Sequence, residues 1–116
     1  MAVATVDIHE GVFKYILIDA KVPGSDEGVT LIRGHASCEY HADVLDRTRE
    51  EPAVKGANLT LRCLGGGRME HRPARQLLNI YGYSQQFGQG DHAKAMELCR
   101  AHLGEDYSIT TSNEGY

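Results

Sequence analysis

The residues that could carry chemistry in this sequence begin with a histidine at the start of an expected helix. In the stretch EYHADVLD, residues 39–46, His41 follows an apolar segment and precedes the amphipathic residues Ala42, Val44 and Leu45. The first N–H groups of a helix have no partner within the helix and attract anions. Because the side chain of Ala42 is small, an anion held at its amide would lie within reach of the imidazole. The alternative is that His41 only supports the junction between a strand and a helix.

Three basic residues could neutralise such an anion. Lys14 is expected on an apolar face of a strand, where an ammonium group is costly unless it reaches water or finds an anion. Arg33 stands at the end of another expected strand, and a solvated position suits it equally well. Arg68 ends the glycine-rich stretch CLGGGR, residues 63–68.

That glycine-rich stretch differs from two known phosphate-binding loops. Cysteine-dependent phosphatases use the pattern C-x5-R, whereas only four residues separate Cys63 from Arg68, so we exclude Cys63 as a nucleophile. No GxxxxGK[ST] pattern is present, which excludes a Walker loop. We expect the three glycines to form a flexible turn between strands. A glycine turn that ends in arginine could also hold an anion through amides and the guanidinium group.

Other kinds of catalytic site are disfavoured. Ser84 follows YGY and does not fit the G-x-S-x-G pattern of serine hydrolases. Six histidines and three cysteines are present without an HExxH or CxxC pattern. Cys99 and His102 lie one helical turn apart and support at most a two-ligand site. We therefore expect neither a metal nor another cofactor.

These side chains must be positioned by alternating strands and helices. Strands are expected over residues 11–21, 29–34, 57–64, 68–72, 76–84 and 107–112. Helices are expected from about residue 42 to Pro52, with Gly56 as a stop, and between the N-cap Asp91 and Gly104. The first of these strands is apolar on both faces, which is typical of a central strand covered on both sides.

The element order predicts an α/β fold. We expect one domain over residues 1–116, with a mixed central β-sheet of about six strands sandwiched between two helices. Residues 1–10 are expected to form a flexible N-terminal arm.

Composition limits the partners and the compartment. The 12 basic and 16 acidic residues give a formal charge of -4, which disfavours non-specific binding of nucleic acid. The apolar runs are too short to cross a membrane, and the N-terminus has neither region of a secretory signal. Three cysteines cannot all pair with one another, so we expect a reduced, cytoplasmic protein.

Seven short blocks carry a resemblance to a known family. In chain order they are GVFKYILI, IRG, EYHADVLD, CLGGGR, YGYS, FGQGDHAKA and SNEGY, and they extend from Gly11 to Tyr116. In this order they resemble the small phosphohistidine phosphatases related to the Janus and ocnus proteins. The resemblance implies a metal- and cofactor-independent hydrolase that acts on phosphohistidine in proteins and on other phosphoramidates. We expect a monomer whose partners are its phosphohistidine-containing substrates, with no nucleic acid or membrane partner.

The resemblance also implies roles for individual residues. The active-site histidine of the family falls on His41. The implied substrate-binding residues are Lys14, Arg33, Ala42, Arg68, Ser84, Gln85 and Gln86. The mammalian members carry smaller or apolar residues where Gln85 and Gln86 stand, which could alter peptide preference if the loop binds through its backbone.

Phosphoryl transfer from phosphohistidine depends mainly on positioning and charge, because its transition state is loose. His41 would act as a general base on the attacking water, or would itself accept the phosphoryl group. Two other classes remain open, a phosphopeptide-binding module with weak chemistry and a developmental interaction protein.

Overall fold

The long strand β2 (Gly11–Lys21) lies at the centre of a six-stranded mixed sheet. The computed structural model describes residues 3–112. The other strands are β1 (Val6–Ile8), β3 (Gly28–His35), β4 (Thr60–Arg72), β5 (Leu77–Tyr81) and β6 (Ser108–Thr111). Their order is β1-β3-β2-β4-β5-β6, with β1 parallel to β3, β5 parallel to β6, and the other pairs antiparallel. The predicted mixed α/β fold is confirmed.

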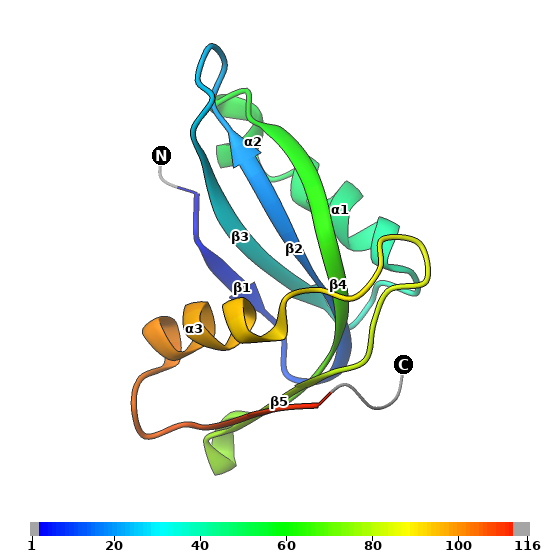
Figure 1. Cartoon of the computed structure of the whole chain (residues 1–116), viewed down its shortest axis with the longest axis vertical. Coiled ribbons are helices and arrows are strands. Elements are labelled where there is room, and N and C mark those ends of the chain that lie inside the picture. The colour runs from blue at the N-terminus through cyan, green and yellow to red at the C-terminus, as the bar shows by residue number, and fades with distance from the viewer. Residues whose placement is uncertain (1–2, 113–116) are drawn as a thin grey trace.

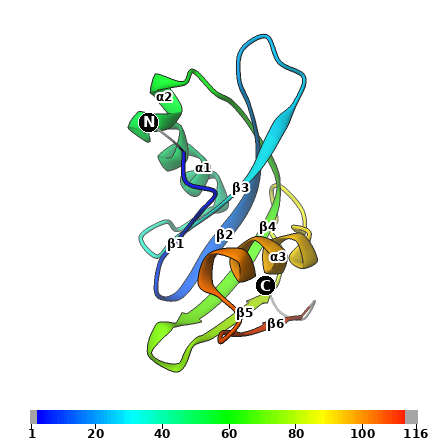
Figure 2. The ribbon, with the colours of Figure 1, turned by 90° about the vertical axis from the view of Figure 1, so that its left-hand side faces the viewer.

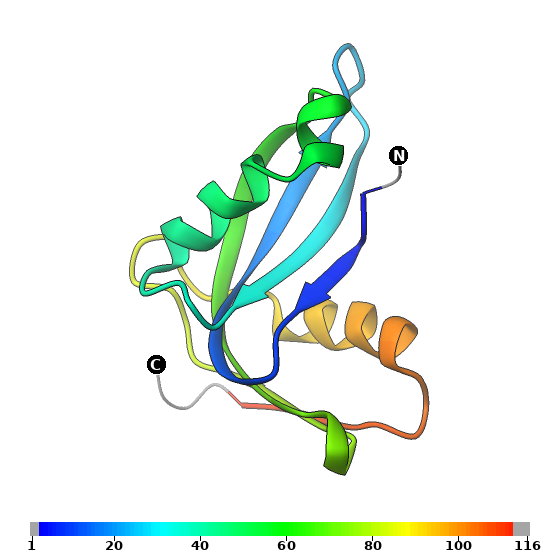
Figure 3. The same cartoon turned by 180° about the vertical axis from the view of Figure 1, so that it is seen from behind.

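Helices cover both faces of the sheet (Figures 1 and 2). Helices α1 (His41–Arg49) and α2 (Pro52–Gly56) lie on one face, and α3 (His92–Leu103) lies on the other (Figure 3). Where one helix was expected on the first face there are two, because Pro52 lacks an N–H and begins a new helix. The short 3-10 helix η1 (Pro73–Arg75) precedes β5. Within residues 3–112, no helix is both long and apolar enough to cross a bilayer.

Alternating side chains of β2 supply the two halves of the hydrophobic core. Phe13, Tyr15 and Leu17 pack on the α3 side. Ile16 and Ile18 pack on the α1 side. The prediction that this strand is central and covered on both faces is confirmed. Lys14 belongs to the α1 side but lies beyond the buried cluster and is only half-buried.

The glycine run at residues 65–67 is part of β4, and the predicted turn is wrong. The two strands expected at 57–64 and 68–72 form one strand that pairs with β2 from Gly11↔His71 to Lys21↔Thr60. An irregularity in the pairing between Leu17 and Ile18 absorbs one extra residue of β4. Glycine is common in turns and also in strands whose backbone is closely approached by neighbouring groups. Composition alone could therefore not distinguish a turn from a strand here.

Part of the segment that was expected to form a flexible arm is a strand. Within it, β1 pairs parallel with β3, and Val6 is buried opposite Ile32. The backbone N–H of Ile32 donates to the carbonyl of Thr5 at 2.8 Å. A strand of three residues is too short to be recognised from alternation. Of the terminal block SNEGY, only Ser112 lies within the described residues.

Candidate active site

His41 is the first residue of α1 and lies over the centre of β4. Tyr40, in an extended conformation, is the N-cap, and its N–H donates to the carboxylate of Asp43 at 3.0 Å. His41 is 7% exposed, and the Nε2 of its imidazole lies 2.8 Å from the carbonyl oxygen of Gly67. A carbonyl oxygen only accepts, so Nε2 carries the proton. This hydrogen bond leaves Nδ1 of His41 as the basic atom of the ring.

The surroundings of His41 lower its pKa below the ordinary value for histidine. Burial is the largest cause, and the positive charges of Lys14 and Arg68 act in the same direction. The hydrogen bond to the Gly67 carbonyl opposes them. The neutral ring therefore predominates at neutral pH, as a base or a nucleophile requires.

Gly66 allows the imidazole to approach β4, and Gly67 allows β4 to pair closely with β5. A Cβ on Gly66 would lie 2.4 Å from the carbonyl oxygen of Tyr15 and 3.0 Å from Cδ2 of His41. A Cβ on Gly67 would lie 2.4 Å from the carbonyl oxygen of Tyr81. Any larger residue at either position would push the strand away from its neighbours, so the site needs both glycines.

A tight loop between β5 and α3 forms the wall opposite α1. Ser84 and Gly88 exchange two backbone hydrogen bonds of 3.1 and 2.8 Å, and the Ser84 hydroxyl accepts the N–H of Phe87 at 3.1 Å. The loop is tied to β4 because Gly66 donates to the Gly88 carbonyl at 3.1 Å and accepts from Gly90 at 2.9 Å. Gly66 thus joins the loop to the strand, next to the residue that holds His41.

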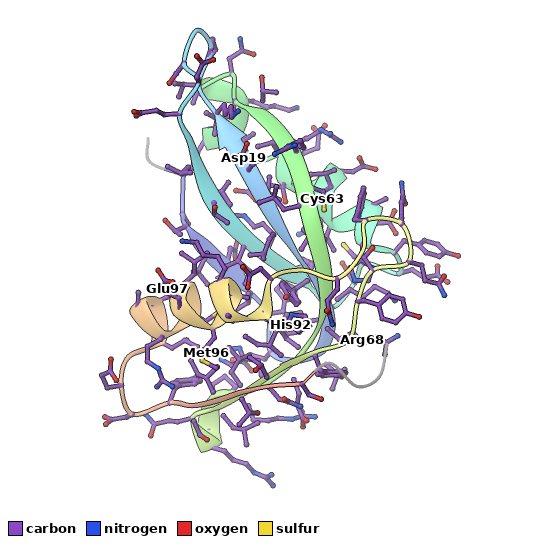
Figure 4. The ribbon with its side chains drawn as sticks, viewed as in Figure 1. Asp19, Cys63, Arg68, His92, Met96 and Glu97 are labelled. Carbon is purple, nitrogen blue, oxygen red and sulfur yellow. The ribbon has the colours of Figure 1, made fainter. Side chains whose placement is uncertain are left out.

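A buried histidine at the start of α3 holds the other end of this loop. Figure 4 shows His92 where α3 begins, next to the sheet. Its Nε2 donates to the Gly82 carbonyl at 2.9 Å, and its Nδ1 accepts the hydroxyl of Tyr15 at 2.5 Å. Tyr15 is fully buried, and burial raises its pKa, so its hydroxyl remains a donor. Tyr15 and His92 therefore fix the segment that precedes Ser84.

Between α1 and the loop lies a pocket of about 360 Å³. Its lining residues are Lys14, Glu39, Tyr40, His41, Ser84, Gln85 and Gln86. A basic imidazole, an ammonium group and the first turn of a helix therefore meet around one space. This combination suits an anion whose cleavage requires a proton acceptor.

Comparison with known proteins identifies the family. The family model described as Janus/Ocnus family matches residues 1–108. The chain belongs to the Janus/Ocnus family. Sex-regulated protein janus-A of Drosophila orena is 46% identical over 107 residues, covering 92% of this chain and 76% of that protein. The 14 kDa phosphohistidine phosphatase of Sus scrofa is 38% identical over 117 residues, covering 96% of this chain and 90% of that protein. The predicted family is confirmed.

In this Janus/Ocnus chain, most of the expected site residues lie together. Lys14, His41, Ser84, Gln85 and Gln86 line one pocket, and Ala42 follows His41 in the first turn of α1. Arg68 lies beside them but lines an adjoining hollow on the other side of Lys14.

Arg33 lies away from the pocket, contrary to the role that the resemblance implied. Its side chain is 4% exposed and binds both carboxylate oxygens of Glu51, at 2.8 and 3.2 Å. It also donates to the carbonyl oxygen of Ala4 at 2.7 Å. Arg33 therefore ties the N-terminal segment to the start of α2. Sequence could not reveal this because Glu51 is 18 residues away.

Several residues of the Janus/Ocnus site were not identified from the sequence. Tyr40 and Glu39 line the pocket, Gly66 and Gly67 support His41, and the Tyr15–His92 pair supports the loop. The glycine run at residues 65–67 was the one feature of the sequence that could have indicated this packing. It marks a close approach of neighbouring groups as well as a turn.

The cysteines of the Janus/Ocnus chain are buried or half-buried thiols with weak nucleophilic character. Burial raises the pKa of Cys38 and Cys63, and raises that of Cys99 to about 12. Protonated thiols are poor nucleophiles and poor metal ligands. Among residues 3–112, no group of three or more His, Cys, Asp or Glu side chains is arranged to hold a metal ion.

Proposed function

We propose that this Janus/Ocnus protein hydrolyses the phosphorus–nitrogen bond of phosphohistidine in proteins. The observation that carries the proposal is the state of His41, whose Nε2 proton is engaged by Gly67 and whose pKa is lowered. Nδ1 is thus a base at neutral pH, beside a pocket suited to an anion. The similarity to the phosphohistidine phosphatase of Sus scrofa supports the same reaction.

The phosphoryl group would be held by main-chain and side-chain donors around the pocket. Lys14 supplies a positive charge, and the amide of Ala42 supplies a donor from the first turn of α1. The Ser84 oxygen already accepts the N–H of Phe87, so its own proton can be donated to a phosphoryl oxygen. Gln85 and Gln86 would contribute backbone amides, and Arg68 would add charge from the adjoining hollow.

In the reaction, Nδ1 of His41 takes a proton from a water molecule as that water attacks phosphorus. The new oxygen–phosphorus bond forms while the phosphorus–nitrogen bond breaks, and its electron pair stays on the substrate imidazole. The proton held by His41 then returns to that nitrogen. The fixed donors stabilise charge on the three oxygens, which is the main requirement of a loose transition state.

The decisive experiment is turnover of phosphoramidate and of a phosphohistidine peptide. His41→Ala should reduce kcat by at least ~10²-fold, the lower range for loss of a general base. His102→Ala, which removes an exposed histidine of α3, is the matched control and should stay within twofold. Near-normal turnover by the His41 variant would refute the proposed mechanism.

A covalent route would use the same atom of His41 as nucleophile. Rapid quenching of the wild-type protein under alkaline conditions would then trap a phosphorylated His41, whereas the general-base route leaves the enzyme unlabelled. A separate alternative is phosphopeptide binding with weak chemistry or a developmental interaction role. The janus-A relatives favour it in one respect, since their name states no enzymatic activity. Tight binding of a phosphopeptide without turnover would support that alternative.

We further propose that the enzyme acts as a monomer in the cytoplasm. The three cysteines are free, and a reducing compartment keeps such thiols unpaired.

A further inference from the structure

A second hollow adjoins the candidate active site on the other side of Lys14. It has a volume of about 190 Å³, roughly six times the space of one water molecule in the liquid. Its lining residues are Val12, Phe13, Lys14, Ala36, Cys38 and Arg68. Because Lys14 lines both spaces, the hollow is next to the pocket beside His41.

The strand register explains why the hollow is open. Lys14 of β2 is paired with Arg68 of β4, so the two side chains point to the same face of the sheet. Helix α1 begins above Gly66, two residue pairs further along the strands, and Figure 3 shows β2 and β4 extending beyond the helices on that face. Val12, two residues before Lys14, is 49% exposed there.

The charge of the hollow differs from that of the whole protein. The chain has a net charge of -4, yet among the described residues the charged side chains that line the hollow are Lys14 and Arg68. The carboxylate next in register is Glu70, opposite Val12, and it pairs with the guanidinium of Arg72 at 3.1 Å. Burial raises the pKa of the Cys38 thiol, which therefore adds no negative charge at neutral pH.

The phosphoryl pocket does not account for this second region. Its lining includes Lys14 but not Arg68, whose side chain faces the adjoining hollow. A phosphohistidine within a protein carries neighbouring side chains into the site, since successive Cα atoms are only about 3.8 Å apart. A guanidinium beside an ammonium group is complementary to a carboxylate.

We propose that the hollow binds a carboxylate side chain of the substrate protein that lies next to the phosphohistidine. This inference rests on the proposed phosphatase function and narrows its substrate class to phosphohistidines in acidic segments. Val12 and Ala36 would contact the aliphatic part of that side chain, and Arg68 would bind its carboxylate.

The test uses peptides that contain one phosphohistidine. Glu, Gln or Lys is placed in turn at each of the two positions before and the two positions after that residue. At one of these positions kcat/KM should be about five- to tenfold higher for Glu than for Gln, as expected for a charge-assisted contact at a partly exposed site. Val12→Glu should abolish this preference and favour the Lys peptide, while turnover of phosphoramidate stays within twofold. Val29→Glu, at a 62% exposed valine elsewhere in the sheet, is the matched control and should keep the preference.

Equal rates for the Glu, Gln and Lys peptides at all positions, with phosphoramidate still hydrolysed, would overturn the inference and leave the proposed function intact. An equal loss for all peptides and phosphoramidate in Val12→Glu would also overturn it. If wild-type protein hydrolyses none of these compounds, the proposed function fails. In that case the inference is tested by binding, with peptides that carry a non-hydrolysable phosphonate analogue of phosphohistidine. Tighter binding of the Glu peptide than of the Gln peptide would support the inference, and equal dissociation constants would overturn it.

Discussion

Replacement of Gly67 by alanine tests whether the glycine run is a packed strand that holds the base. The new Cβ would lie 2.4 Å from the Tyr81 carbonyl oxygen, 2.9 Å from Cε1 of His92 and 3.1 Å from the Tyr15 ring. Ordinary contacts begin near 3.4 Å, so the strand or its neighbours must move by about 1 Å. None of these neighbours is a flexible side-chain end, because one is backbone and two are buried rings.

The expected cost is therefore near the upper end of the range for overpacking, about 3 kcal/mol. For a domain of this size, 1 kcal/mol corresponds to roughly 4 °C in Tm, so the midpoint should fall by about 12 °C. The same movement displaces the carbonyl that accepts the Nε2 proton of His41. We expect kcat to fall by at least ~10-fold at a temperature where the variant remains folded, since the ring loses its orientation.

Thermal unfolding and steady-state kinetics of Gly67→Ala, with Gly56→Ala as matched control, would measure both effects. A Cβ on Gly56 meets no atom within 4 Å at the end of α2, so this variant should be neutral or more stable by about 0.4–1 kcal/mol. Similar small changes in both variants would refute the assignment of Gly67 as a packed support of His41.

Three further predictions follow from the geometry. Because the pKa of His41 is lowered, kcat/KM should fall with decreasing pH only on a limb below about 6.5; a pH profile with a midpoint above 7 would contradict this. Tyr15→Phe leaves Nδ1 of His92 without its donor and should cost about 1–3 kcal/mol in urea unfolding while raising KM; an unchanged KM would contradict the anchoring role. Glu51→Ala leaves the buried Arg33 without its carboxylate partner. Because Glu51 is partly exposed, the free energy of unfolding should fall by only about 2 kcal/mol. The value of kcat/KM should stay within twofold. If Glu51→Ala lowered kcat/KM without lowering stability, Arg33 would have a role in the active site after all.

Local signals in the sequence were sufficient for features set by neighbouring residues. Asp91 caps α3 through the N–H of Lys94 at 3.1 Å, as its position before the helix predicted. Pro52 ended the first helix because a missing N–H acts locally. The alternation that placed Lys14 on the α1 side of β2 is equally local, and it is correct.

Features that depend on contacts between distant segments could not be predicted. The role of Arg33 is decided by Glu51 and by the carbonyl of Ala4, and neither pairing leaves a pattern in the sequence. The expected turn at 65–67 was wrong because the groups that require glycine there belong to distant segments, namely β2, α1, β5, α3 and the loop that precedes α3. His92 had no visible role until the fold brought Tyr15 to its ring.

The acceptor that orients His41 is a main-chain carbonyl, and this has a consequence for how the site can change during evolution. In many enzymes a carboxylate or amide side chain orients the catalytic histidine, and a single codon change removes it. No codon change removes the carbonyl oxygen of Gly67, because every amino acid supplies the same atom. Mutations can only displace it by altering the path of β4. Loss of the proposed activity in diverging copies of this gene should therefore arise mainly at His41 itself or at the glycines beneath it.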